Sequence, residues 1–308
     1  VHGVHICVVG ETGQCGDAVG WTGDLPAASV VAAFDACVKP LLEGAELANR
    51  SQVMAPAWRA FRGGMPFPAI GLADVAMWDL LGRSVGMSVT QLLGQHTRRL
   101  KACASAPPVK DADDGAAMTN EILAQGFRAI KLHSCGDLSR DIAVCEAARE
   151  VAGAEVDLMM DVMAIYDRRR ALALGHVLDE LDYRWYEDPL PETDLDGWRE
   201  LRGALTTPLA GVDAVRFTIH EYARPIADGT FDIVRMDAAR NGISQLRALS
   251  TLAEAFGIGC EGHAFGPALA QAANLQVGSA AGNAEFCELP IPLGALDFGV
   301  KAGFTIDL

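Results

Sequence analysis

The sequence lacks any long apolar run. No stretch of its 308 residues approaches the roughly 18 to 20 uninterrupted apolar residues of a membrane-spanning helix, although half of the residues are hydrophobic. The first residues also lack the basic-then-apolar order of a signal peptide. We therefore expect a globular protein in the cytoplasm, without membrane contact, that buries a sizeable core.

Positive charge is scarce as well. The formal net charge is −15, and the 25 lysines and arginines are scattered rather than gathered into a stripe. Such a chain would repel a phosphate backbone, which argues against nucleic acid as a partner. The eight cysteines include no CxxC pair and no zinc-type spacing, so we expect reduced thiols rather than disulfides or a zinc site.

The first hundred residues predict a small α+β unit. VHICVVGETGQCGDAVGW, residues 4–21, has the pattern of two strands around a glycine-containing turn. Three stretches with helical spacing follow, at residues 29–44 and near residues 52–61 and 70–86. The pattern breaks in LLGQHTRRL, and we place a domain boundary near residue 98.

From residue 99 onward, short strands alternate with helical stretches at a nearly fixed period. This alternation predicts βα units and a parallel sheet, and eight strands are enough to close a barrel. The candidate strands are residues 102–106, 127–133, 156–161, 183–188, 207–213, 231–237, 258–263 and 284–289. We therefore expect an α/β fold: a (β/α)7β TIM-like barrel with an N-terminal α+β capping domain.

One ionisable residue recurs at the end of nearly every candidate strand. The consecutive separations are 28, 26, 26, 24, 26 and 25 residues, for His133, Asp161, Glu187, Asp213, Asp237, His263 and Glu288. Active sites of barrels lie at the C-terminal ends of the strands, so these side chains are the candidate site. Surface charges would not keep the same phase.

Three of these residues, Asp161, Glu187 and Asp213, are acids on successive strands. Three carboxylates in one barrel mouth would repel each other unless a cation neutralised them, and an all-oxygen set of ligands suits Mg²⁺. Each carboxylate could instead cap the following helix or pair with an arginine, but that reading does not explain their common phase.

The remaining residues favour acid/base chemistry. Asp237 and His263 could form a hydrogen-bonded pair in which the carboxylate fixes the imidazole tautomer. Lys131 and His133 are two residues apart on one strand, so both side chains should face the barrel interior. The alternative is that these cations only balance the acidic site.

The motifs resemble the mandelate racemase subgroup of the enolase superfamily over nearly the whole chain. IGLADVAMWDLLGRSVGMSVTQLLGQ resembles the family's helix between its two domains. GFRAIKLH, MMDVMAIYD, WYEDPLPE, PLAGVD, DIVRMDAARNGI and EGHAFG resemble its successive barrel motifs. The resemblance implies that Asp161, Glu187 and Asp213 bind Mg²⁺.

The same resemblance implies the roles of the other residues. Asp237 and His263 would form the His-Asp dyad, Lys131 and His133 would lie on the opposite face of the substrate, and Glu288 would hydrogen-bond the substrate carboxylate. We also expect a homo-oligomer with domains at 1–98 (cap) and 99–290 (barrel), and a segment at 291–308 that returns to the cap.

Four departures from the family pattern stand out. His133 replaces the second lysine of the usual Lys-x-Lys, and Asp213 replaces the usual glutamate ligand. Met163 stands where the family often has asparagine. Both ends are short, because the family's first strand and its final glycine-rich return are not evident, which suggests missing or trimmed segments.

These residues predict an enzyme that removes the proton next to a substrate carboxylate. Mg²⁺, helped by Glu288 and Lys131, would stabilise the enediolate while His133 or His263 takes the proton. We favour dehydration of a sugar acid, a small-molecule carboxylate, to a 2-keto-3-deoxy acid. Racemisation or epimerisation and cycloisomerisation are the alternatives within this chemistry. Outside it, the chain could be a non-catalytic metabolite-binding barrel or a glycoside hydrolase that uses paired carboxylates without a metal.

Overall fold

The structure, a computed structural model, describes residues 3–22, 25–61, 66–212, 218–263, 266–298 and 300, with only the backbone described at 60 and 61. Asp213 lies outside these residues. Among the helices in the described part of the chain, none is long and apolar enough to cross a membrane.

The first part of the chain forms a two-stranded antiparallel sheet and a set of helices. The strands are β1 (Gly3–Val9) and β2 (Cys15–Trp21). The helices are α1 (Ala27–Ala33), the π-helical turn Phe34–Val38, α2 (Lys39–Leu42), the 3₁₀ turn Leu47–Asn49, α3 (Arg50–Phe61), α4 (Phe67–Val85) and α5 (Val89–Leu92). The stretch predicted as one helix over 29–44 is thus divided, because Pro40 has no N–H to donate to the preceding turn.

The rest of the described chain forms a nearly closed parallel barrel, which confirms the predicted fold class. Its strands are β3 (Lys101–Ser105), β4 (Ala129–His133), β5 (Asp157–Asp161), β6 (Trp185–Glu187), β7 (Leu209–Gly211), β8 (Ile233–Met236), β9 (Gly259–Gly262) and β10 (Phe286–Pro290). They pair in the order β10-β3-β4-β5-β6-β7-β8-β9.

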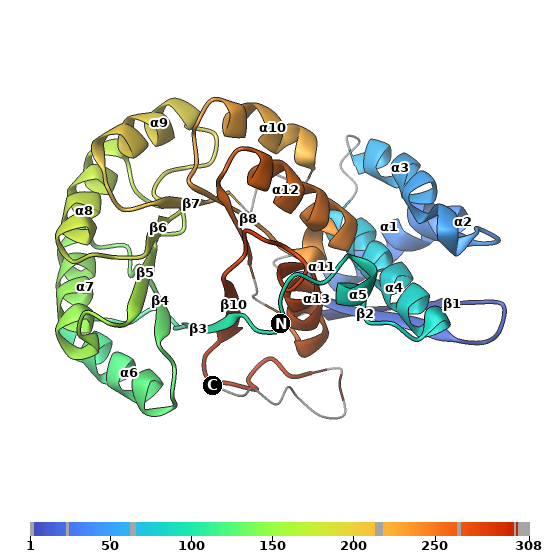
Figure 1. The fold of residues 1–308 in the computed structure, drawn as a ribbon, viewed down its shortest axis with the longest axis horizontal. Helices are drawn as coiled ribbons and strands as arrows, with labels where there is room; N and C mark the ends of the chain where they lie inside the picture. The colour runs from blue at the N-terminus through green and yellow to red at the C-terminus, as the bar shows by residue number, and fades with distance from the viewer. Residues whose placement is uncertain are drawn as a thin grey trace.

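Helices cover the outside of this sheet (Figure 1). They are α6 (Ala112–Ala124), α7 (Leu138–Ala152), α8 (Arg168–Glu180), α9 (Leu195–Ala204), α10 (Ile219–Ala227), α11 (Ala238–Asn241), α12 (Ile243–Ala255) and α13 (Ala268–Gly278). A small, separate apolar cluster contains one residue from each of six barrel strands, namely Cys103, Ala129, Met159, Trp185, Ala210 and Phe286.

The carboxylate of Glu261 bridges β9 and β10, the strands at the two ends of the sheet. Both oxygens of Glu261, on β9, accept backbone N–H groups at the start of β10. The donors are the amide of Glu285 at 2.8 Å and that of Phe286 at 3.1 Å. This side chain therefore helps to close the barrel.

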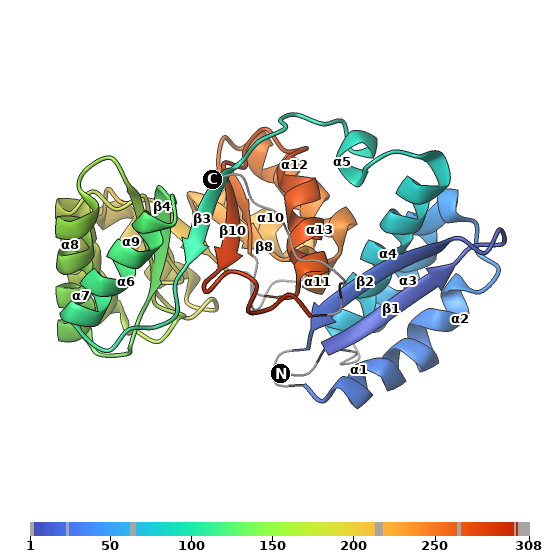
Figure 2. The same ribbon diagram turned by 90° about the horizontal axis from the view of Figure 1, so that it is seen from below.

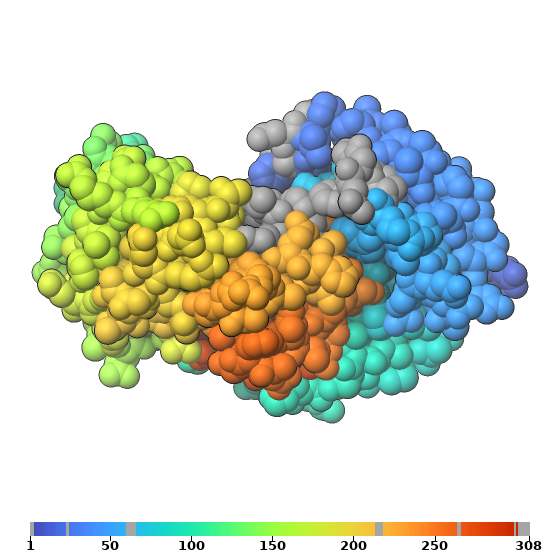
Figure 3. All heavy atoms as spheres, turned by 90° about the horizontal axis from the view of Figure 1, so that it is seen from above, coloured from blue at the N-terminus to red at the C-terminus, as the bar shows by residue number. Residues whose placement is uncertain are grey.

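The cap packs against one side of the barrel, where α11 and α13 lie between the barrel strands and β2 (Figure 2). Helix α4 is mostly buried and contacts both β2 and α11. Gly71 on α4 allows this approach, because a Cβ there would overlap the carbonyl of Arg240. In space-filling form, the cap and the barrel make up two sides of the molecule (Figure 3).

Candidate active site

The predicted acids on β5 and β6 lie side by side at the C-terminal edge of the barrel. In the sheet register, His133 pairs with Asp161 and Asp161 pairs with Glu187. All three side chains therefore start from one level of the barrel. Asp161 and Glu187 are buried, with 7% and 1% of their surface exposed.

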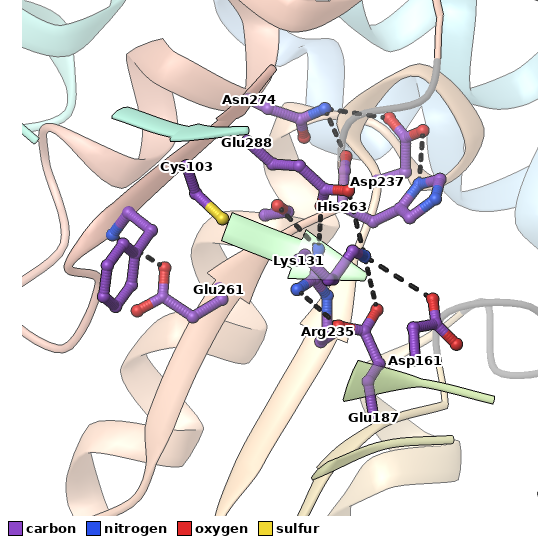
Figure 4. Close-up of polar contacts among 12 residues, drawn as sticks. Cys103, Lys131, Asp161, Glu187, Arg235, Asp237, Glu261, His263, Asn274 and Glu288 are labelled. Atoms are coloured by element: carbon purple, nitrogen blue, oxygen red, sulfur yellow. Dashed lines mark hydrogen bonds and ion pairs between the residues drawn. The ribbon is translucent and has the colours of Figure 1, made fainter. Parts of the chain in front are cut away.

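Lys131 lies at the centre of the acids (Figure 4). Its Nζ is 3.0 Å from Glu187 Oε1, 2.9 Å from Glu288 Oε1 and 3.5 Å from Asp161 Oδ2. Burial and the charge of Arg235 lower the pKa of Lys131, but the surrounding carboxylates raise it more, so the pKa lies above its ordinary value. Lys131 is a cation in this arrangement.

A second buried cation, Arg235, was missed by the sequence analysis. One guanidinium nitrogen lies 3.0 Å from Glu187 Oε2, and another pairs with Glu288 Oε2. Arg235 lies two residues before Asp237 in the strand predicted at 231–237, so the period-two rule could have placed it in the barrel interior. Burial raises the pKa of Glu288, but Lys131 and Arg235 lower it well below its usual range, so Glu288 is ionised.

His133 is held in one tautomer. Its Nδ1 lies 2.6 Å from the carbonyl oxygen of Ala106, which can only accept a hydrogen bond, so Nδ1 is the protonated nitrogen. Nε2 then has a free lone pair and lies 3.5 Å from Asp161 Oδ2. Burial, and then the charge of Lys131, lower the pKa of His133 to about 4, which keeps the ring neutral.

Asp237 and His263 lie next to each other, with Asp237 Oδ2 3.3 Å from His263 Nδ1. Asn274 on α13, a residue that the sequence analysis missed, holds both. Its Nδ2 donates to Asp237 Oδ1 at 3.1 Å and to the His263 carbonyl at 2.7 Å. Its Oδ1 accepts from the amide of Ala238, so this side chain fixes the position of the pair.

A cavity of about 440 Å³ opens over these residues. Both histidines, Asp161 and Glu288 line it. Apolar side chains line another part of its surface, namely Pro107, Pro108, Met163, Pro290 and Ile291. Met163 thus lines the cavity, at the position where the family that the sequence resembles often has asparagine.

The buried carboxylates of the site could act as ligands for a divalent cation. Among the described residues, three carboxylates, Asp161, Glu187 and Glu288, lie against two cations, Lys131 and Arg235. Carboxylate oxygens are the ligands that Mg²⁺ prefers, and the residues present therefore fit this ion. Within the described residues, which exclude Asp213, no group of three possible ligands is close enough to hold a metal.

Two family models match the chain. The enolase C-terminal domain-like model matches residues 114–300, and the N-terminal domain model of mandelate racemase / muconate lactonizing enzyme matches residues 6–94. Together they cover both the cap and the barrel.

Similar proteins carry several activity names. D-galactarolactone cycloisomerase of Agrobacterium fabrum is 28% identical over 85% of this chain and 72% of its own length. L-talarate/galactarate dehydratase of Salmonella typhimurium is 29% identical, over 64% of this chain and 50% of its own length. The chain therefore spans between half and about three quarters of these two relatives.

Among solved structures, magnesium-complexed D-glucarate dehydratase from Agrobacterium tumefaciens is 28% identical and superposes with a TM-score of 0.85. The match covers 94% of this chain and 77% of that one. The barrel and the cap of the structure agree with the two domain models that match the sequence. The chain therefore belongs to the mandelate racemase subgroup of the enolase superfamily.

Proposed function

We propose that this enzyme removes the proton next to the carboxylate of a sugar acid, with Mg²⁺ as cofactor, and expels the β-hydroxyl as water to give a 2-keto-3-deoxy acid. One observation carries the proposal: His133 and His263 line the same cavity as Asp161 and Glu288, above the Lys131 cation. Relatives named as sugar acid dehydratases support the choice of substrate class.

Asp161, Glu187 and Asp213 would hold the metal ion. When bound, the ion would supply positive charge that stabilises an enediolate. Asp213 adds a third carboxylate by its place in the sequence, directly after Val212. Asp161 and Glu187, which are both buried and pair in the register of β5 and β6, support this assignment.

The residues of the chain would divide the remaining work. Lys131 would neutralise charge at the substrate carboxylate. Glu288, which is ionised in this structure, would hydrogen-bond that carboxylate only after taking up a proton. Nε2 of His133, whose lone pair is free, would take the α-proton. His263, oriented by Asp237, would give a proton to the departing hydroxyl, which leaves as water. The resulting enol then becomes the keto acid.

A second candidate is isomerisation. If His263 returned a proton to carbon, the product would be an epimer, and if a ring oxygen left, the reaction would be a cycloisomerisation. Relatives named D-galactarolactone cycloisomerase and L-Lys-D/L-Arg epimerase support epimerisation and cycloisomerisation as alternative reactions. A non-catalytic binding barrel would not need two oriented imidazoles in one cavity.

The test is a screen of sugar acids for keto-acid formation with Mg²⁺ and with excess EDTA. We expect turnover of at least one acid with Mg²⁺ and none with EDTA. Epimer or lactone products would establish the second candidate. Turnover that survives EDTA would contradict the metal-dependent mechanism, and a glycoside hydrolase would behave in that way.

The proposal also covers the domain bounds, the cellular location and the oligomeric state. We assign residues 1–98 to the cap, 99–290 to the catalytic barrel and 291–308 to a segment that returns to the cap. We also propose a cytoplasmic homo-oligomer. Size-exclusion chromatography with light scattering tests the oligomer, because a monomer at micromolar concentration would contradict it.

A further inference from the structure

Backbone strain is concentrated beside the acid-bearing strands. Among the described residues there, four other than glycine adopt left-handed φ angles: Met163 at 50°, Ala164 at 58°, Asp188 at 42° and Val212 at 70°. They follow β5, β6 and β7, the strands that lead to Asp161, Glu187 and Asp213. Such conformations are costly for side chains with a Cβ, and they persist only where the surroundings enforce them.

Asp188 makes hydrogen bonds that hold these turns together. Its N–H donates to the carbonyl of Ala210 at 2.9 Å, and its own carbonyl accepts from Ala164 at 2.9 Å. Its side-chain Oδ1 accepts from the amide of Val212 at 2.8 Å. One residue, 6% exposed, therefore links the chain segments that follow three neighbouring strands.

The links reach the predicted metal ligands. The amide of Met163 donates to Asp161 Oδ1 at 2.8 Å, so the turn that Asp188 holds at Ala164 also sets the orientation of Asp161. Glu187 directly precedes Asp188 in the chain. Val212 directly precedes Asp213, which lies outside the described residues.

Gly211 makes room for this arrangement. Its φ is 153°, and a Cβ at this position would overlap Asp188 Oδ1. The Asp188 carboxylate is thus packed directly on the end of β7. A side chain at residue 211 would push it away from Val212.

We propose that Asp188 is a positioning residue that preorganises the metal site by fixing the ends of β5, β6 and β7 through backbone hydrogen bonds. The inference rests on the proposed metal site. The side-chain oxygen Oδ1, as an acceptor for the Val212 amide, is the essential feature; the negative charge of Asp188 is not.

The test compares Asp188→Ala with Asp188→Asn by calorimetric titration of the purified protein with MgCl₂. Replacing a residue that orients metal ligands typically weakens metal affinity by about 10- to 100-fold, and we expect this for Asp188→Ala. Asp188→Asn keeps an oxygen that can accept from Val212, so its affinity should stay within about threefold of wild type, clearly less than the loss expected for Asp188→Ala.

Asp179→Ala is the matched control. Asp179 Oδ1 accepts from the amides of Thr206 and Thr207 just before β7, at the opposite end of that strand. This variant should lower the melting temperature without weakening Mg²⁺ binding. Gly211→Ala leaves Asp188 in place but displaces its carboxylate, and it should weaken Mg²⁺ binding as Asp188→Ala does.

The outcomes separate the two proposals. If the wild type does not bind Mg²⁺, the proposed metal site is wrong and this inference falls with it. If the wild type binds Mg²⁺ but Asp188→Ala or a folded Gly211→Ala binds equally well, only the role of Asp188 is refuted. Equal losses in Asp188→Ala and Asp188→Asn would also refute it, because charge rather than the hydrogen bond would then matter.

Discussion

At the residue scale, two imidazoles in different environments share one cavity. Nδ1 of His133 is committed to the carbonyl of Ala106, whereas Nδ1 of His263 faces the Asp237 carboxylate. A neutral ring with a free Nε2 suits the removal of a proton, and the Asp237 carboxylate orients the second ring for proton transfer. The two residues are therefore expected to act as base and acid, respectively.

This assignment predicts that His133→Ala lowers kcat by about 10²- to 10⁴-fold, the usual contribution of a general base. Mg²⁺ affinity should change little, because His133 is not a predicted ligand. Proton exchange at the α-carbon in D₂O, followed by NMR, is the direct measurement. His176→Ala removes an exposed histidine on α8 and is the control.

The opposite pattern would contradict the assignment. If His133→Ala keeps both α-proton exchange and turnover while Lys131→Ala loses both, lysine is the base. Lys131 would then have to be deprotonated, although three surrounding carboxylates stabilise its charged form.

The sequence identified part of this site and missed the rest for physical reasons. Acids and histidines at a common phase are visible in a sequence because they recur with the βα period. Arg235 was passed over, although it faces the same interior. Asn274 comes from a helix, and its contact with Asp237 depends on packing. Asp188 acts through backbone conformation, and a non-glycine residue with positive φ has no signature in the sequence.

At the element scale, closure of the barrel involves a buried acid. Glu261 is 5% exposed, and its two oxygens accept the amides next to β10. Burial raises the pKa of Glu261 to about 7, although those amides and Arg235 lower it. The strand pattern predicted eight strands, but it could not show that a side chain helps to join the last two.

The raised pKa predicts a specific pH dependence of stability. Folded Glu261 binds its proton more tightly than the unfolded chain does, so its contribution is fully present below about pH 4.5 and is lost as the pH rises through about 7. At 1.36 kcal/mol per pKa unit, the loss is on the order of 3 kcal/mol. Urea unfolding from pH 4.5 to 8 measures it.

Glu261→Gln should remove this part of the slope, because glutamine does not titrate. Glu121→Gln, which removes an exposed carboxylate on α6, is the control and should keep the slope. An unchanged pH dependence in Glu261→Gln would show that Glu261 does not titrate in this way.

At the scale of the whole molecule, the cap and the barrel meet at the start of α12. Asp74 on α4 accepts hydrogen bonds from the amide of Ser244 at 2.9 Å and from its hydroxyl at 2.7 Å. A side chain of the N-terminal domain therefore acts as a helix cap at the start of a barrel helix. Trp78 Nε1 donates to the same hydroxyl. Helix α11, which precedes α12, begins directly after Asp237.

Asp74→Ala should therefore lower the free energy of unfolding by about 1 to 2 kcal/mol, as loss of an N-cap does, and loosen the contact between cap and barrel. Asp111→Ala removes an exposed N-cap within the barrel, at α6, and should cost less. Urea unfolding compares the two. A cost for Asp74→Ala no larger than for Asp111→Ala would argue against a cap formed across the domains.

The central claim is metal-dependent removal of an α-proton, and exchange of that proton in D₂O tests it most directly. With a sugar acid found by the screen, NMR should show loss of the α-proton signal or formation of α-deuterated or keto product when wild-type enzyme and Mg²⁺ are present. EDTA should stop this reaction, and added Mg²⁺ should restore it. Exchange and turnover that continue unchanged in EDTA would contradict the account.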